Sequence, residues 1–527
     1  MEFSIKEQTR TSKSDSEWRS VAILGSELDR IAEVVSFFKI PFEINPDNVR
    51  CHDIAILYRE YGYVLSDYGL PLLCVPSDTE EFFHFLDMMN VKSKCVNEEF
   101  WIDLRIQKKM KISFNVSKLF YFSGPIDVVV SSKGIPLLCR IRGTNVSLLC
   151  IDLVGEIERL FELGMNLRPT TFFKFSSRLN LASLVPRGLG DVLLRLLAHV
   201  DVSQEEFQSH MSSLDGLRYL VLAAAVISAQ KPFRTLGFWK NGSKYALTIT
   251  HDVDTKYGFE VGIRRLREVE RKYGVKSAWN IPSGRYRINP KFLESLVSEG
   301  CEIGSHGFRH DGKLIFQKPN DLVSILRACK ETLERLGNCE VKGFRSPLLQ
   351  HSHRILQAVL QAGFLYDSSL PSWEAHCRTA GTSHGIKTVY PLIEDDLVEL
   401  PVTMPQDHQL IRLAGLQPDE LLEFWRTIRR HIKSIGGLCN IIIHPDKGLF
   451  GEESALPYYK EFIKEVVSDE ECWLTLPSKV AEWWLFRRNS IVTNREPVPC
   501  RFEKSHHDNS GGMAGFDEYT PQDFVFE

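Results

Sequence analysis

Apolar positions along this chain follow two periods, one typical of strands and one typical of helices. Short apolar runs suit buried strands, and longer stretches with apolar residues at helical spacing suit amphipathic helices. From Val21 to about Leu163 the two patterns alternate, which predicts an α/β sheet domain. Within it, residues 135–152 (IPLLCRIRGTNVSLLCID) predict a β-hairpin that turns at 143–145.

Residues 166–240 follow a mainly helical pattern, and the longest apolar run of the chain lies there, YLVLAAAVISA at 219–229. That run is too short to cross a bilayer, so we predict a buried helix and no transmembrane segment. Residues 1–18 are polar and lack the apolar core of a secretory signal, so we expect a disordered leader.

A strand–helix rhythm continues from Tyr245 for more than two hundred residues. The expected strands are 246–251, 277–282, 301–306, 341–346, 364–369, 397–402, 438–444 and 472–477. The expected helices between them are 260–274, 289–300, 320–337, 352–363 and 418–437. Repeated strand-then-helix units favour an irregular parallel (β/α) barrel, in which reactive side chains gather where the strands end.

These patterns divide an α/β protein into five segments. They are a leader (1–18), a smaller α/β accessory domain (19–165), a helical connector (166–240), a (β/α) barrel (241–488) and a polar C-terminal tail (489–527). The accessory domain shows no glycine-rich phosphate loop and no recognisable nucleophile, so we expect it to carry no site of its own.

Composition narrows the class of protein. With 43% apolar and 25% charged residues, the 527-residue chain is an ordinary globular protein. A net charge of −4 without a basic stripe argues against nucleic-acid binding. The twelve cysteines include no C-x-x-C pair, and several lie in apolar runs, which favours reduced thiols and a cytoplasmic protein. The oligomeric state stays open.

Polar residues follow the expected barrel strands at the positions where a barrel has its active site. These residues are Asp252, Asp254, His306, His310, Arg345, Asp367 and His444. Asp252 and Asp254 are two positions apart and share one face of an extended chain. Two histidines four residues apart can bind one ion, and adding a carboxylate makes a set that suits divalent metals, with zinc favoured. A lone H-x-x-x-H pair would more often be surface or capping histidines, but here it comes with the other residues.

Five short motifs follow one another in the second half of the chain: THDVD (250–254), SHGFRH (305–310), FRSP (344–347), YDSSLPSW (366–373) and IIIHP (441–445). With these motifs in this order, residues of about 245 to 480 resemble the polysaccharide deacetylase family, also called the NodB homology domain or carbohydrate esterase family 4. The resemblance implies an irregular (β/α) barrel and a metal-dependent hydrolase that removes N-acetyl groups from a glycan or a sugar-containing precursor.

The resemblance also implies a role for each residue at the strand ends. It assigns Asp252 as general base, His444 as general acid, Arg345 as the partner that orients the base, Asp367 as the neighbour that tunes the acid, and Asp254, His306 and His310 as metal ligands. The family usually has adjacent aspartates, whereas Val253 intervenes here, so the division of roles between Asp252 and Asp254 stays open.

Several alternatives stay open. A related barrel could hydrolyse a non-sugar amide, or a catalytically silent barrel could only bind carbohydrate. Asp367 could equally cap the turn that follows it. The remaining candidates are expected to be structural: His251 packed on the opposite face, Asp446 a solvated loop residue, His376, His384 and His408 on the surface, and 483–486 (WWLF) in helix packing.

Overall fold

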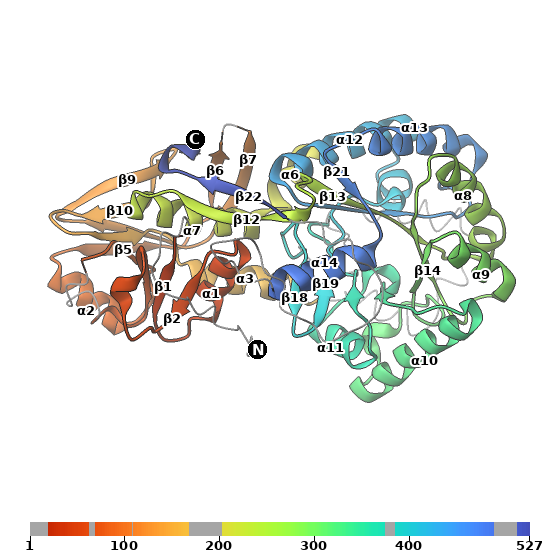
Figure 1. Ribbon diagram of the computed structural model, residues 1–527, viewed down its shortest axis with the longest axis horizontal. Helices are drawn as coiled ribbons and strands as arrows, with labels where there is room; N and C mark the ends of the chain where they lie inside the picture. The colour runs from red at the N-terminus through yellow and green to blue at the C-terminus, as the bar shows by residue number, and fades with distance from the viewer. Residues whose placement is uncertain (1–18, 63–68, 108, 168–202, 375–384, 490–513) are drawn as a thin grey trace. The chain divides into compact units, whose positions relative to one another are not determined.

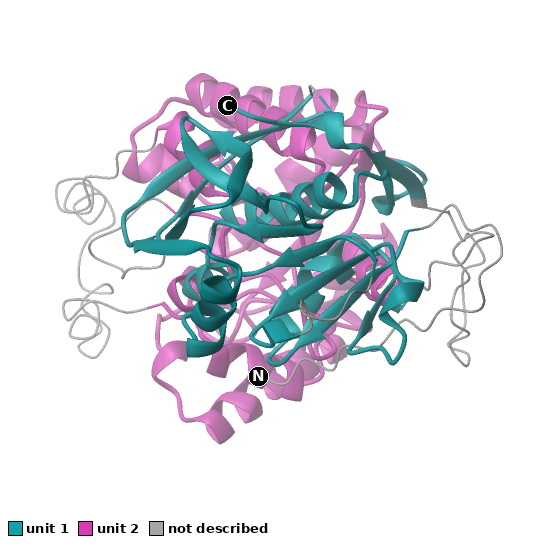
Figure 2. Cartoon of the chain, turned by 90° about the vertical axis from the view of Figure 1, so that its left-hand side faces the viewer, with its two compact units in different colours: residues 1–160, 212–242, 489–527 teal, residues 161–211, 243–488 magenta. Residues whose placement is uncertain are grey.

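The computed structural model describes residues 19–62, 69–107, 109–167, 203–374, 385–489 and 514–527 (Figure 1). The chain forms two compact units (Figure 2). Unit 1 comprises Met1–Leu160, Ser212–Gly242 and Asn489–Glu527, and unit 2 comprises Phe161–Met211 and Ser243–Arg488. Both are mixed α/β, and unit 2 carries a curled sheet of parallel strands, which confirms the predicted fold class.

Unit 1 is built on a seven-stranded sheet. Its order is β2 (Phe42–Ile44), β1 (Val21–Gly25), β3 (Ile54–Tyr58), β4 (Leu72–Cys74), β11 (Val146–Leu149), β10 (Ile135–Ile141) and β9 (Ile126–Ser132). The first five strands are parallel, and β10 runs antiparallel to both of its neighbours, β11 and β9. The predicted hairpin is confirmed as β10 and β11. Every residue of β1 and β3 is buried, as expected for parallel strands covered on both faces.

The helices described in this region are α1 (Asp29–Phe37), α2 (Glu80–Met88), α3 (Leu153–Met165) and α7 (Ser213–Ala229). Helix α7 contains the long apolar run and is buried along nearly all its length, which confirms the predicted buried helix. Gly216 lets α7 pack close to Phe114, because a Cβ at position 216 would lie 2.3 Å from the Phe114 ring. Among the described helices none is long and apolar enough to span a membrane by itself, and only α6 (Gln204–His210) with α7, across a bend, would suffice.

The remaining strands of unit 1 form three small antiparallel sheets. They are β5 (Lys92–Val96) with β8 (Leu119–Ser123); β6 (Phe100–Ile106) with β7 (Met110–Val116) and β23 (Phe524–Phe526); and β12 (Phe233–Lys240) with β22 (Ala514–Tyr519).

Parts of the predicted connector and tail therefore belong to sheets. In the predicted tail, β22 pairs with β12 and β23 with β6, and Tyr519 and Phe524 are buried. Short alternating segments such as 514–519 gain this structure only from partner strands far away in sequence, so polarity alone did not reveal it. Residues 168–202 of the predicted helical connector lie outside the described residues.

Unit 2 is built on a nine-stranded sheet that is open in the described part of the chain. Its order is β18 (Leu392–Glu394), β19 (Leu397–Glu399), β17 (Tyr366–Asp367), β16 (Gly343–Phe344), β15 (Glu302–Ser305), β14 (Ala278–Ile281), β13 (Tyr245–Asp252) and β20 (Leu438–Ile443), with β21 (Cys472–Leu474) also paired to β13. All neighbours are parallel except β18 and β19. The carboxyl ends of the parallel strands therefore open onto one rim.

Helices lie around the outside of this sheet (Figure 1). They are α8 (Ile263–Lys272), α9 (Pro290–Ser298), α10 (Pro319–Gly337), α11 (His353–Gln361), α12 (Pro418–Ile435), α13 (Leu456–Val467) and α14 (Pro477–Asn489). Sequence signals set their ends: Ser352 caps α11 by accepting from the Ile355 N–H, and Gly436 ends α12 with a φ of 85°.

Candidate active site

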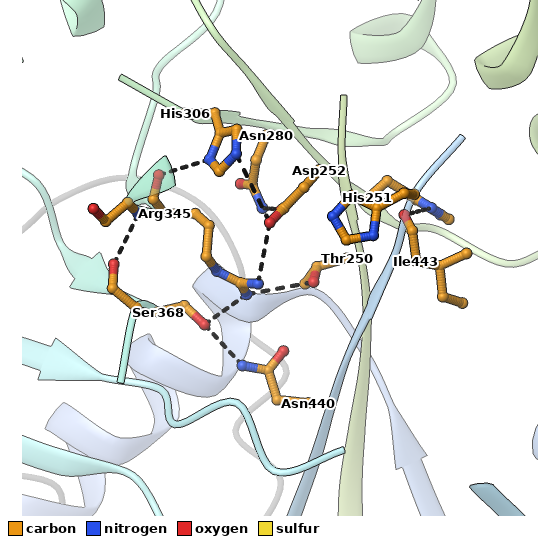
Figure 3. Close-up of polar contacts among 12 residues, drawn as sticks. Thr250, His251, Asp252, Asn280, His306, Arg345, Ser368, Asn440 and Ile443 are labelled. Atoms are coloured by element: carbon orange, nitrogen blue, oxygen red, sulfur yellow. Dashed lines mark hydrogen bonds and ion pairs between the residues drawn. The ribbon is translucent and has the colours of Figure 1, made fainter. Parts of the chain in front are cut away.

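Strand β13 delivers both aspartates to the rim. All its residues are buried between β14 and β20, and Asp252 is its last residue. His251 points the other way, as predicted: its Nδ1 donates to the Ile443 carbonyl at 3.1 Å (Figure 3). Its ring stacks on Trp279 with centroids 3.9 Å apart. The period of the strand therefore separates the packed histidine from the carboxylates.

Asp254, His306 and His310 come together as one cluster. Asp254 Oδ1 lies 3.3 Å from both His306 Nε2 and His310 Nε2, and the candidate ligand atoms all lie within 4.8 Å of one another. His306 Nδ1 donates to the Arg345 carbonyl at 2.8 Å, which leaves the Nε2 lone pair facing Asp254. His306 Nε2 and Asp254 Oδ1 are buried and have no hydrogen-bond partner among the described residues. A cation is the partner that suits these orphaned atoms.

Charge in the cluster also favours a cation. Burial opposes ionisation of Asp254, but His310, His306 and His444 hold the pKa of Asp254 far below its usual range. Burial lowers the pKa of His310 to about 4, so its imidazole is neutral, as a metal ligand must be. His310 has a φ of 51°, and Arg285 Nη1 holds this turn by donating to the Arg309 and His310 carbonyls at 2.7 and 2.9 Å.

Asp252 adjoins the cluster and is held by two polar partners. Asn280 Nδ2 donates to its Oδ1 at 2.8 Å, and Arg345 Nη1 lies 3.7 Å from its Oδ2 (Figure 3). Burial would raise the pKa of Asp252, but Arg345, His306 and His444 outweigh it and lower that pKa. Asp252 is thus an ionised carboxylate in a buried place.

A buried polar network fixes Arg345 beside that carboxylate. Arg345 Nη2 donates to Ser368 Oγ at 2.8 Å and to Thr250 Oγ1 at 3.4 Å, and Asn440 Nδ2 donates to Ser368 Oγ at 2.8 Å. Figure 3 shows the guanidinium between Asp252 on one side and Ser368 on the other. Strands β13, β16, β17 and β20 therefore all contribute to holding one arginine.

His444, which follows β20, lies on another side of Asp254. Its Nε2 is 3.9 Å from Asp254 Oδ2, and its Nδ1 is 2.6 Å from Asp407 Oδ1. Asp407 Oδ2 also accepts from the His444 N–H at 2.8 Å. Burial lowers the pKa of His444, but Asp407, followed by Asp254 and Asp252, raises it to about 10. His444 is therefore a cation at neutral pH.

The comparison with protein families identifies one part of unit 2. The family model described as polysaccharide deacetylase matches residues 240–366. Residues 240–366 form a polysaccharide deacetylase domain. The match confirms the resemblance over these residues, which include Asp252, Asp254, His306, His310 and Arg345; the motif at 441–445 and most of the motif at 366–373 lie beyond it.

Two curated relatives match parts of the chain. The peptidoglycan deacetylase-like protein FGM2 of Gibberella zeae is 32% identical over 117 residues, which are 22% of this chain and 34% of that protein. The peptidoglycan deacetylase of Helicobacter pylori is 25% identical over 155 residues, 27% of this chain and 53% of that protein. The chain thus spans about a third and about half of the length of these relatives.

Among solved structures, a putative polysaccharide deacetylase from Mycobacterium smegmatis is similar at 23% identity and a TM-score of 0.42. That similarity covers 51% of this chain and 97% of the other.

One residue expected at the acid side of the candidate site lies elsewhere. Asp367 does not contact His444; its Oδ1 accepts from Ser369 Oγ at 2.7 Å, and its neighbour across the sheet is Glu399. Burial raises the pKa of both carboxyls, and the charge of Asp367 raises the pKa of Glu399 further. Asp367 lies beside Glu399 because of the register between β17 and β19. Asp407 occupies the position beside His444 that was predicted for Asp367. The only sequence signal for Asp407 is that it is an acidic residue shortly after the expected strand 397–402.

Two further expectations are wrong. Asp446 is buried rather than solvated: its Oδ2 accepts from the Asp254 N–H at 3.2 Å, and its Oδ1 accepts from the Thr255 hydroxyl. Burial, with the Asp254 charge, raises the pKa of Asp446 to about 6. His408 is half-buried rather than a fully exposed surface histidine: its ring lies 6.1 Å from that of His444, and burial lowers its pKa to about 4. His376 and His384 lie outside the described residues.

Proposed function

We propose that unit 2 is a metal-dependent deacetylase that hydrolyses N-acetyl groups of a glycan or a sugar-containing precursor, with zinc as the favoured ion. One observation carries the proposal: an ionised carboxylate and a protonated imidazole flank the same cluster of metal-ligand atoms. Asp252 Oδ2 lies 3.9 Å from His306 Nε2, and His444 Nε2 lies 3.9 Å from Asp254 Oδ2. A base and an acid in opposite charge states beside one centre suit hydrolysis of an amide.

Asp254, His306 and His310 would hold the ion, since Asp254 Oδ1 and His306 Nε2 are buried without a hydrogen-bond partner among the described residues and His310 Nε2 lies 3.3 Å from Asp254 Oδ1. When bound, a divalent cation supplies acidification of water and polarisation of an amide carbonyl. Three protein ligands leave further positions for water and substrate, as in catalytic rather than structural zinc sites.

Asp252 takes the role of general base. It stays ionised because Arg345 lies beside it, and Asn280 fixes its orientation through Oδ1. It can therefore accept the proton of the attacking water without rotating. The intervening Val253 left open which of the two aspartates is the base and which is the metal ligand. We assign Asp254 as the ligand because both histidines contact Asp254 Oδ1.

His444 takes the role of general acid. Asp407 Oδ1 accepts from His444 Nδ1 at 2.6 Å and keeps the ring charged, so the Nε2 proton points toward Asp254. The amine of the sugar leaves poorly as an anion, and a proton from His444 Nε2 lets it leave as a neutral amine.

The test is acetate release from N-acetylated oligosaccharides by the purified full chain, with metal content measured in the same samples. Metal is removed with a chelator and restored one ion at a time. We expect activity to return with zinc or another first-row ion. Asp252→Asn and His444→Ala should keep their metal and lose about 10²- to 10⁴-fold in kcat. Full activity in either variant contradicts the role assigned to that residue.

The same experiment separates the alternatives. Acetate or ammonia released only from non-sugar amides would favour a barrel hydrolase of a different substrate class. A protein that binds oligosaccharide but neither takes up metal nor releases acetate would favour the silent carbohydrate-binding barrel. The cytoplasmic location and the five segment boundaries stay predictions.

A further inference from the structure

We propose that Tyr286 is a positioning residue for the candidate metal ligand Asp254. Tyr286 and Asp446 hold the two ends of the peptide group that precedes Asp254. This inference rests on the proposed function, since it concerns the ion that Asp254 would bind. Tyr286 has no part in the mechanism above and lies outside the five motifs. It follows β14 in sequence and Asp446 follows β20, so the two residues reach the peptide group from the strands on either side of β13.

The peptide group between Val253 and Asp254 lies directly beyond the end of β13. The Val253 N–H still continues the strand pairing, because it donates to the Asn280 carbonyl at 3.0 Å. The next two backbone groups bond to side chains instead. Tyr286 Oη donates to the Val253 carbonyl at 2.7 Å, and the Asp254 N–H donates to Asp446 Oδ2 at 3.2 Å. The carbonyl and the N–H of one trans peptide point in opposite directions, so these two hydrogen bonds fix its plane from both sides.

The orientation of the 253–254 peptide decides where the carboxylate of Asp254 lies. Extended residues advance by about 3.3 Å each, so an extended chain would separate the Cα atoms of Asp252 and Asp254 by about 6.6 Å. Both carboxylates nevertheless approach one atom, because Asp252 Oδ2 and Asp254 Oδ1 lie 3.9 and 3.3 Å from His306 Nε2. Strand β13 ends at Asp252, so the peptide group that follows sets the direction from which Asp254 faces the two histidines of the cluster.

The two side chains that hold this peptide are themselves fixed. The Tyr286 ring packs against Phe259, with ring centroids 5.4 Å apart. Burial, with the charge of Asp446, raises the pKa of Tyr286 well above its usual value, so the hydroxyl keeps its proton and donates. Asp446 Oδ1 accepts from the Thr255 hydroxyl. A Cβ at Gly258 would lie only 2.6 Å from that oxygen, so the glycine makes room for the carboxylate.

The test is zinc binding by the purified full chain, which is freed of metal with a chelator and titrated in competition with a chromophoric chelator. Loss of a residue that orients a metal ligand typically weakens metal affinity about 10- to 100-fold. Tyr286→Phe keeps the ring and its packing and frees only one end of the peptide, so we expect the lower end of that range, a rise of about tenfold in the zinc Kd.

Tyr257→Phe is the matched control. The Tyr257 hydroxyl also lies at a backbone carbonyl, that of Gly451 at 3.3 Å, but this carbonyl does not belong to the peptide of a candidate ligand. The zinc Kd should stay unchanged in this variant. Cobalt(II) in place of zinc adds a spectroscopic readout: the visible absorption should change in Tyr286→Phe, where the Asp254 oxygen is less well oriented, and should match wild type in Tyr257→Phe.

A double-variant cycle tests whether the two residues act on one peptide group. Asp446→Ala alone should weaken zinc binding about 10- to 100-fold. Adding Tyr286→Phe should weaken it little further, because a peptide released at one end has already lost its orientation. Effects that multiply would mean two independent contacts and would overturn the inference.

The remaining outcomes separate the inference from the proposed function. An unchanged zinc Kd in Tyr286→Phe overturns the inference even if the wild-type protein releases acetate. Equal weakening in Tyr286→Phe and Tyr257→Phe also overturns it, as does a Tyr286→Phe protein that is unfolded before metal is added, because the hydroxyl would then act on the fold as a whole. A wild-type protein that binds no zinc overturns both. Zinc binding that depends on Tyr286, in a protein that releases no acetate, supports the inference while the proposed function fails.

Discussion

Replacing Asp407 by asparagine is the sharpest test of the acid side of the site. In the structure both oxygens of Asp407 contact His444: Oδ1 is 2.6 Å from Nδ1, and Oδ2 accepts from the backbone N–H. Asparagine keeps one acceptor for the ring but loses the negative charge, and its NH₂ group replaces the oxygen that accepts from the His444 N–H. The change therefore removes the charge of Asp407 while it keeps an acceptor for His444 Nδ1.

The magnitude follows from the pKa of His444. Burial lowers that pKa, and Asp407, with Asp254 and Asp252, raises it from 6.5 to about 10. The net rise corresponds to about 5 kcal/mol in favour of the protonated ring, at about 1.4 kcal/mol per pKa unit. A cation bound to Asp254 would offset the negative charge of that carboxylate, so Asp407 would be the main group that raises the pKa of His444. Removing an opposite charge in contact lowers a pKa by about 1 to 3.

The assay is the pH dependence of kcat/KM for acetate release. A general acid works only while it is protonated, so activity is lost as pH rises through its pKa. Because Asp407→Asn lowers the pKa of His444, the alkaline limb should move to lower pH by about 1 to 3 pH units. Above the new limb, kcat/KM should fall about tenfold for each pH unit. The same change at Asp395, an exposed turn residue, should leave the profile unmoved.

Two results would refute this reasoning. An alkaline limb that stays in place would mean that His444 is not the acid or that Asp407 does not set its pKa. A loss of activity equal at every pH, accompanied by loss of metal, would mean that Asp407 acts through the structure of the cluster rather than through the charge of His444.

Three further changes test other parts of the site. His306→Ala should lose metal, measured by elemental analysis, while Asp252→Asn keeps it; full metal content in His306→Ala would contradict the ligand assignment. Asp446→Ala removes the acceptors of the Asp254 N–H and the Thr255 hydroxyl, so it should weaken metal affinity about 10- to 100-fold in a chelator competition. Unchanged affinity would show that these two hydrogen bonds are dispensable for metal binding. Glu399→Gln should leave the free energy of unfolding in urea within about 1 kcal/mol of wild type, because burial and Asp367 raise the pKa of Glu399 and so favour its neutral form. Glu399→Ala should cost about 1 to 3 kcal/mol; equal losses would argue against a neutral Glu399.

Most of the barrel could be predicted from local pattern. The apolar run that ends at Asp252 predicted a buried strand, and its period of two correctly separated His251 from the carboxylates. Parallel strands then bring Asp252, His306, Arg345 and His444 to one rim, so their positions at strand ends predicted a common site. Each of these predictions depends on residues close together in sequence or on the shared geometry of a parallel sheet.

The pairing of side chains across that rim was decided only by the tertiary structure. Asp407 meets His444 across 37 residues, and Asp446 meets the backbone of Asp254 across 192. Asp367 instead turns toward Glu399 because of the register between β17 and β19. Period and motif order describe which residues reach the rim, but the path of each loop and the register of each strand pair settle which of them touch. Loop paths and strand registers depend on packing throughout the unit, which the pattern of residues along the sequence does not describe.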